Sequence, residues 1–269
     1  MWFPRSQTLH IGLSARRLVL ARMGGIWPGK LVASDSFDVE QGTDAEPWRP
    51  AVNALEHLLA SIDGKKHVLH IVLSGRFVRW QLLPWRPELA QPKELAAYAG
   101  LRFRETFGKT AQDWRILHSP QPPGKTMPAC AVDGALMEAL RSICDISGAR
   151  LATVTPYFGS AFDRWRNVLK GDAVWFGLVE ADSFSLGLLR EKNWMSLRTQ
   201  RLDGNLRDVL PGMMAQIGIS ADVLQASLPL YLAGDGEPPM LPEDLSFDWL
   251  LPKPQAQSAA AGCRLALGV

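Results

Sequence analysis

The chain has 269 residues, of which 47% are hydrophobic and 21% charged, a composition that suits one large two-lobed domain or two small ones. The formal net charge of +2 is too small to indicate nucleic-acid binding, and no stretch approaches the ~18 apolar residues of a membrane-spanning helix. The N-terminus lacks the form of a secretory signal, and the three cysteines have neither pairing nor metal-binding spacing, which favours free thiols in a reducing cytosol.

Runs rich in Leu, Val and Ile, separated by turn residues, predict strands and helices along the whole chain. In chain order we expect strands at 9–14, 17–24 and 31–39, a helix at 47–62, strands at 68–74 and 77–85, a helix at 92–107, strands at 114–118 and 128–132, and a helix at 134–147. Segment 150–156 leads into the second half, which continues with a helix at 157–169, a hairpin over 173–202, a helix at 205–217 and a strand at 229–233.

One strand–strand–strand–helix unit occurs twice. In the first copy Gly12 is followed 15 residues later by Trp27, and in the second Gly177 is followed 17 residues later by Trp194. The two copies lie about 165 residues apart. This repetition predicts one domain of two similar lobes with a ligand-binding cleft between them. The alternative is a small α/β domain in which the repeat is coincidental.

Three glycine-bearing turns follow predicted strands and are candidate ligand contacts. The first contains Gly12 and Ser14, the second Gly177, and the third Gly234 and Gly236. Because glycine has no Cβ, such turns let backbone N–H groups approach a phosphate closely. Each turn alone is weak evidence, since ordinary turns also use glycine, but the order of the three is more specific.

This order resembles the actin-like ATPase fold and, within it, the PilM/GspL-type cytoplasmic proteins of type IV pilus and type II secretion assemblies. In that resemblance residues 10–17 take the place of the first phosphate loop, 174–185 of the second, and 232–236 of the adenosine-side turn. The residues that the resemblance implies at the nucleotide site are Gly12, Ser14, Gly234 and Gly236.

The resemblance also implies the fold class, which is α/β and actin-like (ribonuclease H-like), with two lobes and an inserted α+β subdomain in the first lobe. The expected boundaries are 1–152 for the first lobe, about 78–134 for the subdomain inserted in it, 153–254 for the second lobe, and 255–269 for a linker and a C-terminal helix that returns to the first lobe.

Departures from the family pattern predict a protein without ATPase activity. Nucleotide-hydrolysing members of this fold have Asp-x-Gly in both phosphate loops, whereas here the first position is His10 and the second turn holds Glu180 and Asp182. A neutral imidazole cannot replace a carboxylate beside Mg²⁺, and without the metal phosphoryl transfer loses a main source of charge stabilisation. We therefore expect no catalytic residue, no metal site and no required cofactor, with ATP bound weakly at most.

Ten tryptophans are many for this length. Those in predicted turns or loops are Trp2, Trp27, Trp85, Trp194 and Trp249. Tryptophan is enriched at protein interfaces because it buries a large area with few rotatable bonds, and the alternative is that each one caps the core of its lobe. The run 77–85 is the best candidate for partner contact, and the apolar segment 245–251 is the second. The residues expected to bind a partner are Phe77, Trp80, Leu82, Leu83 and Trp85.

The function that the resemblance implies is a non-catalytic cytoplasmic scaffold, peripheral to the inner membrane, that binds the cytoplasmic tail of a membrane-anchored pilus or secretion protein. The alternative is a nucleotide-binding actin-like ATPase or kinase-like switch with divergent phosphate loops. GspL-type proteins continue into a transmembrane helix, so its absence here favours the PilM-like form, although a GspL-type chain cut before that helix would look the same. The partner's identity and the formation of a homodimer stay open.

Overall fold

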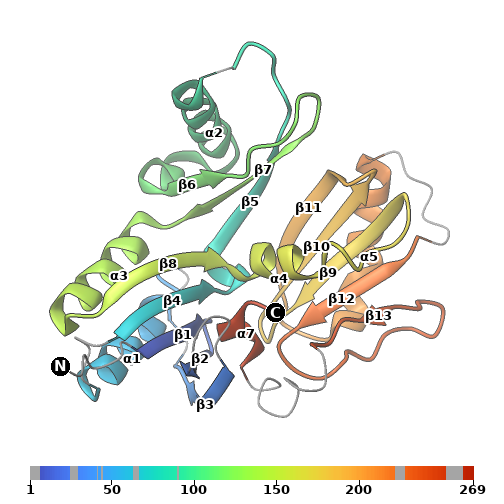
Figure 1. Ribbon diagram of the computed structural model, residues 1–269. Helices are drawn as coiled ribbons and strands as arrows, with labels where there is room; N and C mark the ends of the chain where they lie inside the picture. Colours follow the sequence, from blue (N-terminus) through green and yellow to red (C-terminus); the bar gives the residue numbers. More distant parts are fainter. Residues whose placement is uncertain are drawn as a thin grey trace.

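Two five-stranded sheets lie side by side in the computed structural model, and a third, smaller sheet projects beyond them (Figure 1). The structure describes residues 7–24, 30–40, 42–43, 45–62, 67–89, 91–221, 228–252 and 263–269. Trp2, Trp27 and the expected linker 255–261 lie outside these residues. None of the helices in the described ranges combines the length and the apolar character needed to cross a bilayer.

The first sheet has the strand order β3-β2-β1-β4-β8. Its strands are β1 (Gln7–Leu13), β2 (Arg17–Gly24), β3 (Lys30–Asp38), β4 (His67–Leu73) and β8 (Arg150–Pro156). Strand β1 pairs antiparallel with β2 and parallel with β4. Because side chains alternate along a strand, Leu9, Ile11 and Leu13 share one face, and helices α1 (Arg49–Ala60) and α3 (Gly134–Ser147) cover it.

The second sheet repeats this plan with the order β11-β10-β9-β12-β13. Its strands are β9 (Ala173–Val179), β10 (Ser183–Arg190), β11 (Asn193–Arg201), β12 (Leu230–Gly234) and β13 (Asp248–Trp249). Strand β9 pairs antiparallel with β10 and parallel with β12, as β1 does with its neighbours. Trp175 faces helix α5 (Leu206–Ser220), and Phe176 faces helix α4 (Tyr157–Trp165) on the opposite side. The predicted two-lobed α/β architecture is confirmed.

The third sheet is antiparallel, in the order β5-β7-β6, and lies in the chain between β4 and α3. It follows the short 3-10 helix η2 (Gly75–Phe77). Its elements are β5 (Val78–Leu83), α2 (Pro92–Phe107), the 3-10 helix η3 (Gly108–Asp113), β6 (Arg115–His118) and β7 (Met127–Val132). Leu83, Phe103 and Ala129 form a small core of their own, separate from the cores of the two large sheets. We call this unit the small sheet.

One helical turn, α7 (Arg264–Leu267), joins the two large sheets. It packs on β1, β2 and β4 of the first sheet. The same core cluster contains Val19 of the first sheet, Phe176 of the second, and Leu265 and Ala266 of α7. In Figure 1 α7 accordingly lies between β2 and β12.

Most predicted elements occur where the sequence places them, and the differences lie at their ends. Helices 92–107 and 134–147 have the predicted bounds, whereas α4 ends at Trp165, earlier than predicted, and α5 continues to Ser220. The sequence did not predict η3 or the two-residue strand β13. Both are too short to show a hydrophobic period.

Candidate functional site

A buried carboxylate bridges the two lobes beside their hairpin turns. Glu180 follows β9, and its Oε1 accepts a hydrogen bond of 2.8 Å from the backbone N–H of Gly75, in the first lobe. The hydroxyl of Ser183 donates another, of 3.1 Å, to the same oxygen. The turn that was predicted to be the second phosphate loop therefore directs its acid onto the protein's own backbone.

The environment of Glu180 favours the protonated acid. The residue is 5% exposed, and its Oε2 has no hydrogen-bond partner among the described residues. Burial raises the pKa of Glu180 to about 7, and the nearby Asp182 acts in the same direction, against the hydrogen bonds that the carboxyl accepts. A proton on Oε2 leaves Oε1 free to accept both hydrogen bonds. A partly neutral carboxyl in this position is a poor ligand for Mg²⁺.

Two arginines hold the third glycine turn. Arg17, at the start of β2, forms an ion pair with Asp235. Arg264 of α7 donates hydrogen bonds from Nη1 to the carbonyl oxygens of Gly234 (3.1 Å) and Gly236 (2.6 Å). Burial raises the pKa of Asp235, although both arginines oppose the rise. The turn after β12 is thus fixed to the first lobe and to α7.

The first predicted turn is also occupied by the protein itself. A Cβ on Gly12 would lie 2.5 Å from Cγ of Leu265 and 2.7 Å from the backbone nitrogen of Ala266. Gly12 is therefore needed for the close approach of α7 to β1. The hydroxyl of Ser14 donates to the carbonyl oxygen of Arg17 and accepts from its N–H, both at 3.0 Å, so it closes the β1–β2 turn.

The two remaining predicted nucleotide contacts differ from each other. A Cβ on Gly234 would lie 2.2 Å from the carbonyl oxygen of Val179, so this glycine permits the close pairing of β12 with β9. Gly236 has a φ of 136° with open space around its Cβ position. Its carbonyl oxygen accepts from Arg264. Of the four residues, only Gly236 has free space beside it.

These contacts define what the turns between the lobes can do chemically. The backbone N–H of Gly75 already binds the carboxyl group of Glu180, and the guanidinium of Arg17 already pairs with the carboxylate of Asp235. Among the described residues, no group of three or more His, Cys, Asp and Glu side chains could hold a metal ion. These contacts join the two lobes at the turns that were predicted to bind a nucleotide.

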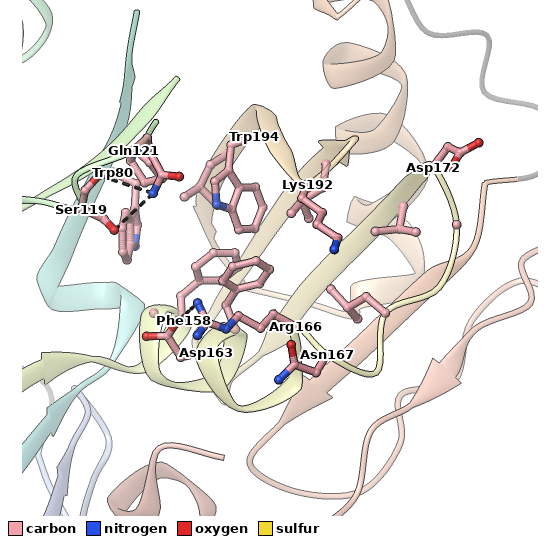
Figure 2. Close-up of a pocket in the computed structure, with 18 residues that line it drawn as sticks. Trp80, Ser119, Gln121, Phe158, Asp163, Arg166, Asn167, Asp172, Lys192 and Trp194 are labelled. Carbon is pink, nitrogen blue, oxygen red and sulfur yellow. Dashed lines mark hydrogen bonds and ion pairs between the residues drawn. The ribbon is translucent and has the colours of Figure 1, made fainter. Parts of the chain in front are cut away.

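A separate pocket of about 540 Å³ lies between the small sheet and the second large sheet (Figure 2). Four aromatic rings line it, and we call it the aromatic pocket. They are Trp80 of β5, Phe158 and Phe162 of α4, and Trp194 of β11. Phe158 lies 5.7 Å from both Trp80 and Trp194, and Phe162 lies 4.6 Å from Trp194, measured between ring centroids. The rings thus form a continuous apolar wall from one sheet to the other.

The rim of the aromatic pocket is polar and has both charges. Figure 2 shows Ser119 and Gln121 on the side of the small sheet, and Asp163, Arg166 and Asn167 on α4 and just beyond it. An apolar floor with a few polar groups at the edge is typical of sites that bind small molecules or extended peptide segments.

Hydrogen bonds between the small sheet and the second lobe fix the width of this pocket. Thr126, just before β7, donates from its backbone N–H to Oδ1 of Asn193 at 3.0 Å and from its hydroxyl to the same atom at 2.9 Å. The ammonium group of Lys125 donates to the carbonyl oxygen of Glu191 at 3.2 Å. The aromatic pocket is therefore preformed.

The predicted partner-binding residues are dispersed by the fold. Trp80 lines the aromatic pocket, and Leu82 is partly buried against the core that joins the lobes. Phe77 and Leu83 are 6% and 0% exposed, and their side chains belong to the cores of the first sheet and of the small sheet. Trp85 is 46% exposed and lies apart from the pocket lining.

The other aromatic candidates pack inward. Trp194 is 6% exposed and belongs to the core that joins the lobes. Trp249, in segment 245–251, lies on β13 and is partly buried against the core of the second sheet. Trp249 agrees with the alternative that tryptophans cap the cores, whereas Trp194 both packs in a core and lines the aromatic pocket.

Sequence reasoning missed the contribution of α4. Phe158 and Phe162 are spaced i, i+4 and therefore lie on one face of the helix. Tyr157, Ala161 and Trp165 are buried as well, so apolar residues occupy more of this short helix than a single core-facing stripe requires. That excess of apolar surface is the signal that a second apolar contact, here the aromatic pocket, is formed.

The fold defines a class of protein. Two sheets of equivalent strand order, linked by a helix and carrying a small inserted sheet, make an actin-like fold. No protein-family model and no curated protein matches the chain in sequence.

Solved structures of this fold match most of the chain. The cytoplasmic domain of EpsL, an inner-membrane component of the type II secretion system of Vibrio cholerae, is 12% identical with a TM-score of 0.60, over 91% of this chain and 89% of that one. The PilM–PilN type IV pilus biogenesis complex gives 16% identity, a TM-score of 0.57, and coverage of 86% and 82%. A Bacteroides thetaiotaomicron protein with an actin-like ATPase fold is 13% identical with a TM-score of 0.57, over 87% of this chain and 83% of that one. At these identities the similarity is one of fold.

Replacing Glu180 with Gln will change how stability depends on pH. The folded-state pKa of about 7 lies above the ordinary glutamate pKa of 4.5, so the folded protein binds an extra proton between these values. The wild type therefore loses stability as pH rises from about 4.5 to above 7, by at most on the order of 3 kcal/mol for this group. Urea unfolding at a series of pH values should show a shallower loss for Glu180→Gln.

Glu138→Gln, an exposed position on α3, is the control for the Glu180 experiment and should follow the wild type. Because burial also raises the pKa of Asp182 and of Asp235, part of the slope will remain in Glu180→Gln. The same slope in Glu180→Gln as in the wild type would contradict the assignment.

Gly12→Ala will destabilise the protein in the absence of any ligand. The added Cβ overlaps α7, and overpacking of this kind costs about 1–3 kcal/mol. Gly212→Ala is the matched control, since its Cβ meets nothing within 4 Å on helix α5 and should stabilise by roughly 0.5–1 kcal/mol. Urea midpoints measure both. Unchanged stability of Gly12→Ala would show that Gly12 is not held against α7.

Proposed function

We propose that the protein is a non-catalytic cytoplasmic component of a type IV pilus or type II secretion assembly, at the inner membrane, and that it binds the cytoplasmic tail of a membrane-anchored partner. The observation that supports tail binding is the preformed aromatic pocket between the small sheet and the second lobe. A preformed apolar pocket reduces the ordering cost of binding an extended segment.

The fold comparisons support the cellular setting of the proposal. The similar structures include a cytoplasmic domain of an inner-membrane secretion component and a complex of PilM with PilN. We infer that this chain, like PilM, acts through a second protein. The two lobes then serve as a frame that holds the small sheet and α4 at a fixed separation.

The contacts that occupy the turns between the lobes support the part of the proposal that says the protein is not a catalyst. Glu180 accepts from Gly75, and Arg264 holds the turn of Gly234 and Gly236. A nucleotide would have to displace these contacts to reach the backbone. We infer that the protein needs no nucleotide to bind its partner.

Filling the aromatic pocket tests the proposal. Gly159 of α4 lines the pocket, and a Cβ there would lie 3.6 Å from Cη2 of Trp80, which is ordinary contact. Gly159→Leu should therefore fold, with equal or higher melting temperature because glycine is unfavourable in a helix, and should occupy the pocket. Tail binding should weaken by about tenfold or more, equivalent to ~1.4 kcal/mol.

The measurement is fluorescence anisotropy with labelled peptides copied from the cytoplasmic tails of the organism's pilus and secretion inner-membrane proteins. Gly212→Leu on α5, with open space around it, is the matched control and should bind as the wild type does. The proposal fails if no tail binds the wild type, or if the tail that binds does so equally well to Gly159→Leu.

A further inference from the structure

A second, smaller pocket of about 290 Å³ adjoins the aromatic pocket and is lined by three arginines. We call it the arginine pocket. The arginines are Arg76 of η2, Arg79 of β5 and Arg201 of β11. The same pocket is bordered by Ser183 and Thr199 of the second lobe, which add hydroxyl groups. It therefore lies across the junction between the small sheet and the second large sheet.

Carboxylates face two of the three arginines of the arginine pocket, and Glu180 lies beside the pocket wall through its hydrogen bond to Gly75. Asp203 forms an ion pair with Arg201, and the buried Asp182 interacts electrostatically with Arg76 and Arg201. Arg79 has no carboxylate partner among the described residues, and its Nη1 donates only to the carbonyl oxygens of Arg76 and Val78. A half-buried guanidinium without a counter-charge is unfavourable. Burial, together with the charge of Arg76, lowers the pKa of Arg79.

One side chain connects the two pockets. Trp80 lines both the aromatic pocket and the arginine pocket. Because neighbouring side chains on a strand point to opposite faces, Arg79 lies on the other face of β5 from the indole of Trp80, and the two pockets lie on either side of this strand. A peptide that fills both pockets passes around the edge of β5, with an apolar part on one side of the strand and an anionic part on the other.

We propose that the arginine pocket receives the carboxylate of an acidic side chain in the partner's tail, next to the apolar side chains that fill the aromatic pocket; this inference rests on the proposed function. The planar guanidinium fork of arginine matches a carboxylate in two parallel hydrogen bonds. The acidic side chain supplies the counter-charge that Arg79 lacks. The protein thereby recognises two features of the tail, an apolar side chain and an acidic side chain.

Peptide selection tests this without knowledge of the partner. A random library of short peptides is selected on the purified full chain, and each binder is then synthesised with its acidic residue intact and with that residue changed to its amide. We expect binders to combine Leu, Ile, Phe or Trp with Asp or Glu at a constant spacing. The amide form should bind roughly ten- to a hundredfold more weakly, as is usual for loss of a hydrogen bond to a charged group.

Binding to variants of the protein tests whether the affinity difference between the acidic and amide peptides arises in the arginine pocket. In Arg79→Gln the acidic and amide peptides should bind with equal affinity, whereas Arg141→Gln, exposed on α3, should keep the wild-type preference. Because Arg79 has no carboxylate partner among the described residues, its replacement should leave the melting temperature nearly unchanged. If Arg79→Gln does not fold, Arg201→Gln, at an exposed position of the same pocket, makes the same comparison.

The outcomes separate this inference from the proposed function. Two outcomes would overturn the inference alone. In the first, peptides lose binding to Gly159→Leu but show no preference for an acidic residue. In the second, peptides keep the acidic preference in the arginine variant that folds. A library that yields no peptide dependent on the aromatic pocket would overturn the proposed function and the inference together.

Discussion

Arg264 reaches from α7 to the turn after β12, and the relation between the two lobes depends on this contact. Arg264 is 8% exposed, and its guanidinium donates to two carbonyl oxygens of that turn. A helix of one turn has no stability of its own, so α7 is held by packing on Gly12 and by this hydrogen-bonded charge. Asp235, within the same turn, forms an ion pair with Arg17 of the first lobe. Removal of one member would leave a buried charge without its partner, which is strongly destabilising.

The position of the candidate site follows from this constraint. Arg264, Asp235 and Glu180 use polar groups of the turns between the lobes for contacts within the protein. Two pockets lie on the side of the small sheet, where α4 and β11 face β5. In the function that we propose, the two lobes act as a support, and recognition of the partner depends on the pocket between the inserted unit and that support.

Much of the fold could be predicted from the sequence because local signals agree with the final structure. Helix α2 begins with Pro92 and a capping box formed by Gln91 and Glu94, and α3 begins at a capping Asp133 and ends at Gly148 in a left-handed conformation. The hairpin repeat was visible for the same reason, since strand alternation and turn residues are local properties.

The site could not be predicted in the same way because its contacts are not local. Glu180 and Gly75 are separated by 105 residues in the sequence, and Arg17 and Asp235 by 218. Gly12 and Gly234 have the residue type that a phosphate turn would need, yet close backbone packing requires the same type. Only the structure distinguishes the two uses, because the distinction depends on what lies within 3 Å of the missing Cβ. The aromatic pocket likewise draws on segments that the sequence places far apart.

Calorimetric titration with ATP and Mg²⁺ tests the central claim most directly, because that claim is that the turns between the lobes bind each other and leave no nucleotide site. We predict no saturable heat and no shift in melting temperature, even at millimolar nucleotide and with a protein concentration high enough to detect weak binding. One-to-one binding of Mg²⁺–ATP with micromolar affinity would contradict this account, and would identify the protein as a nucleotide-dependent switch whose interlobe contacts open.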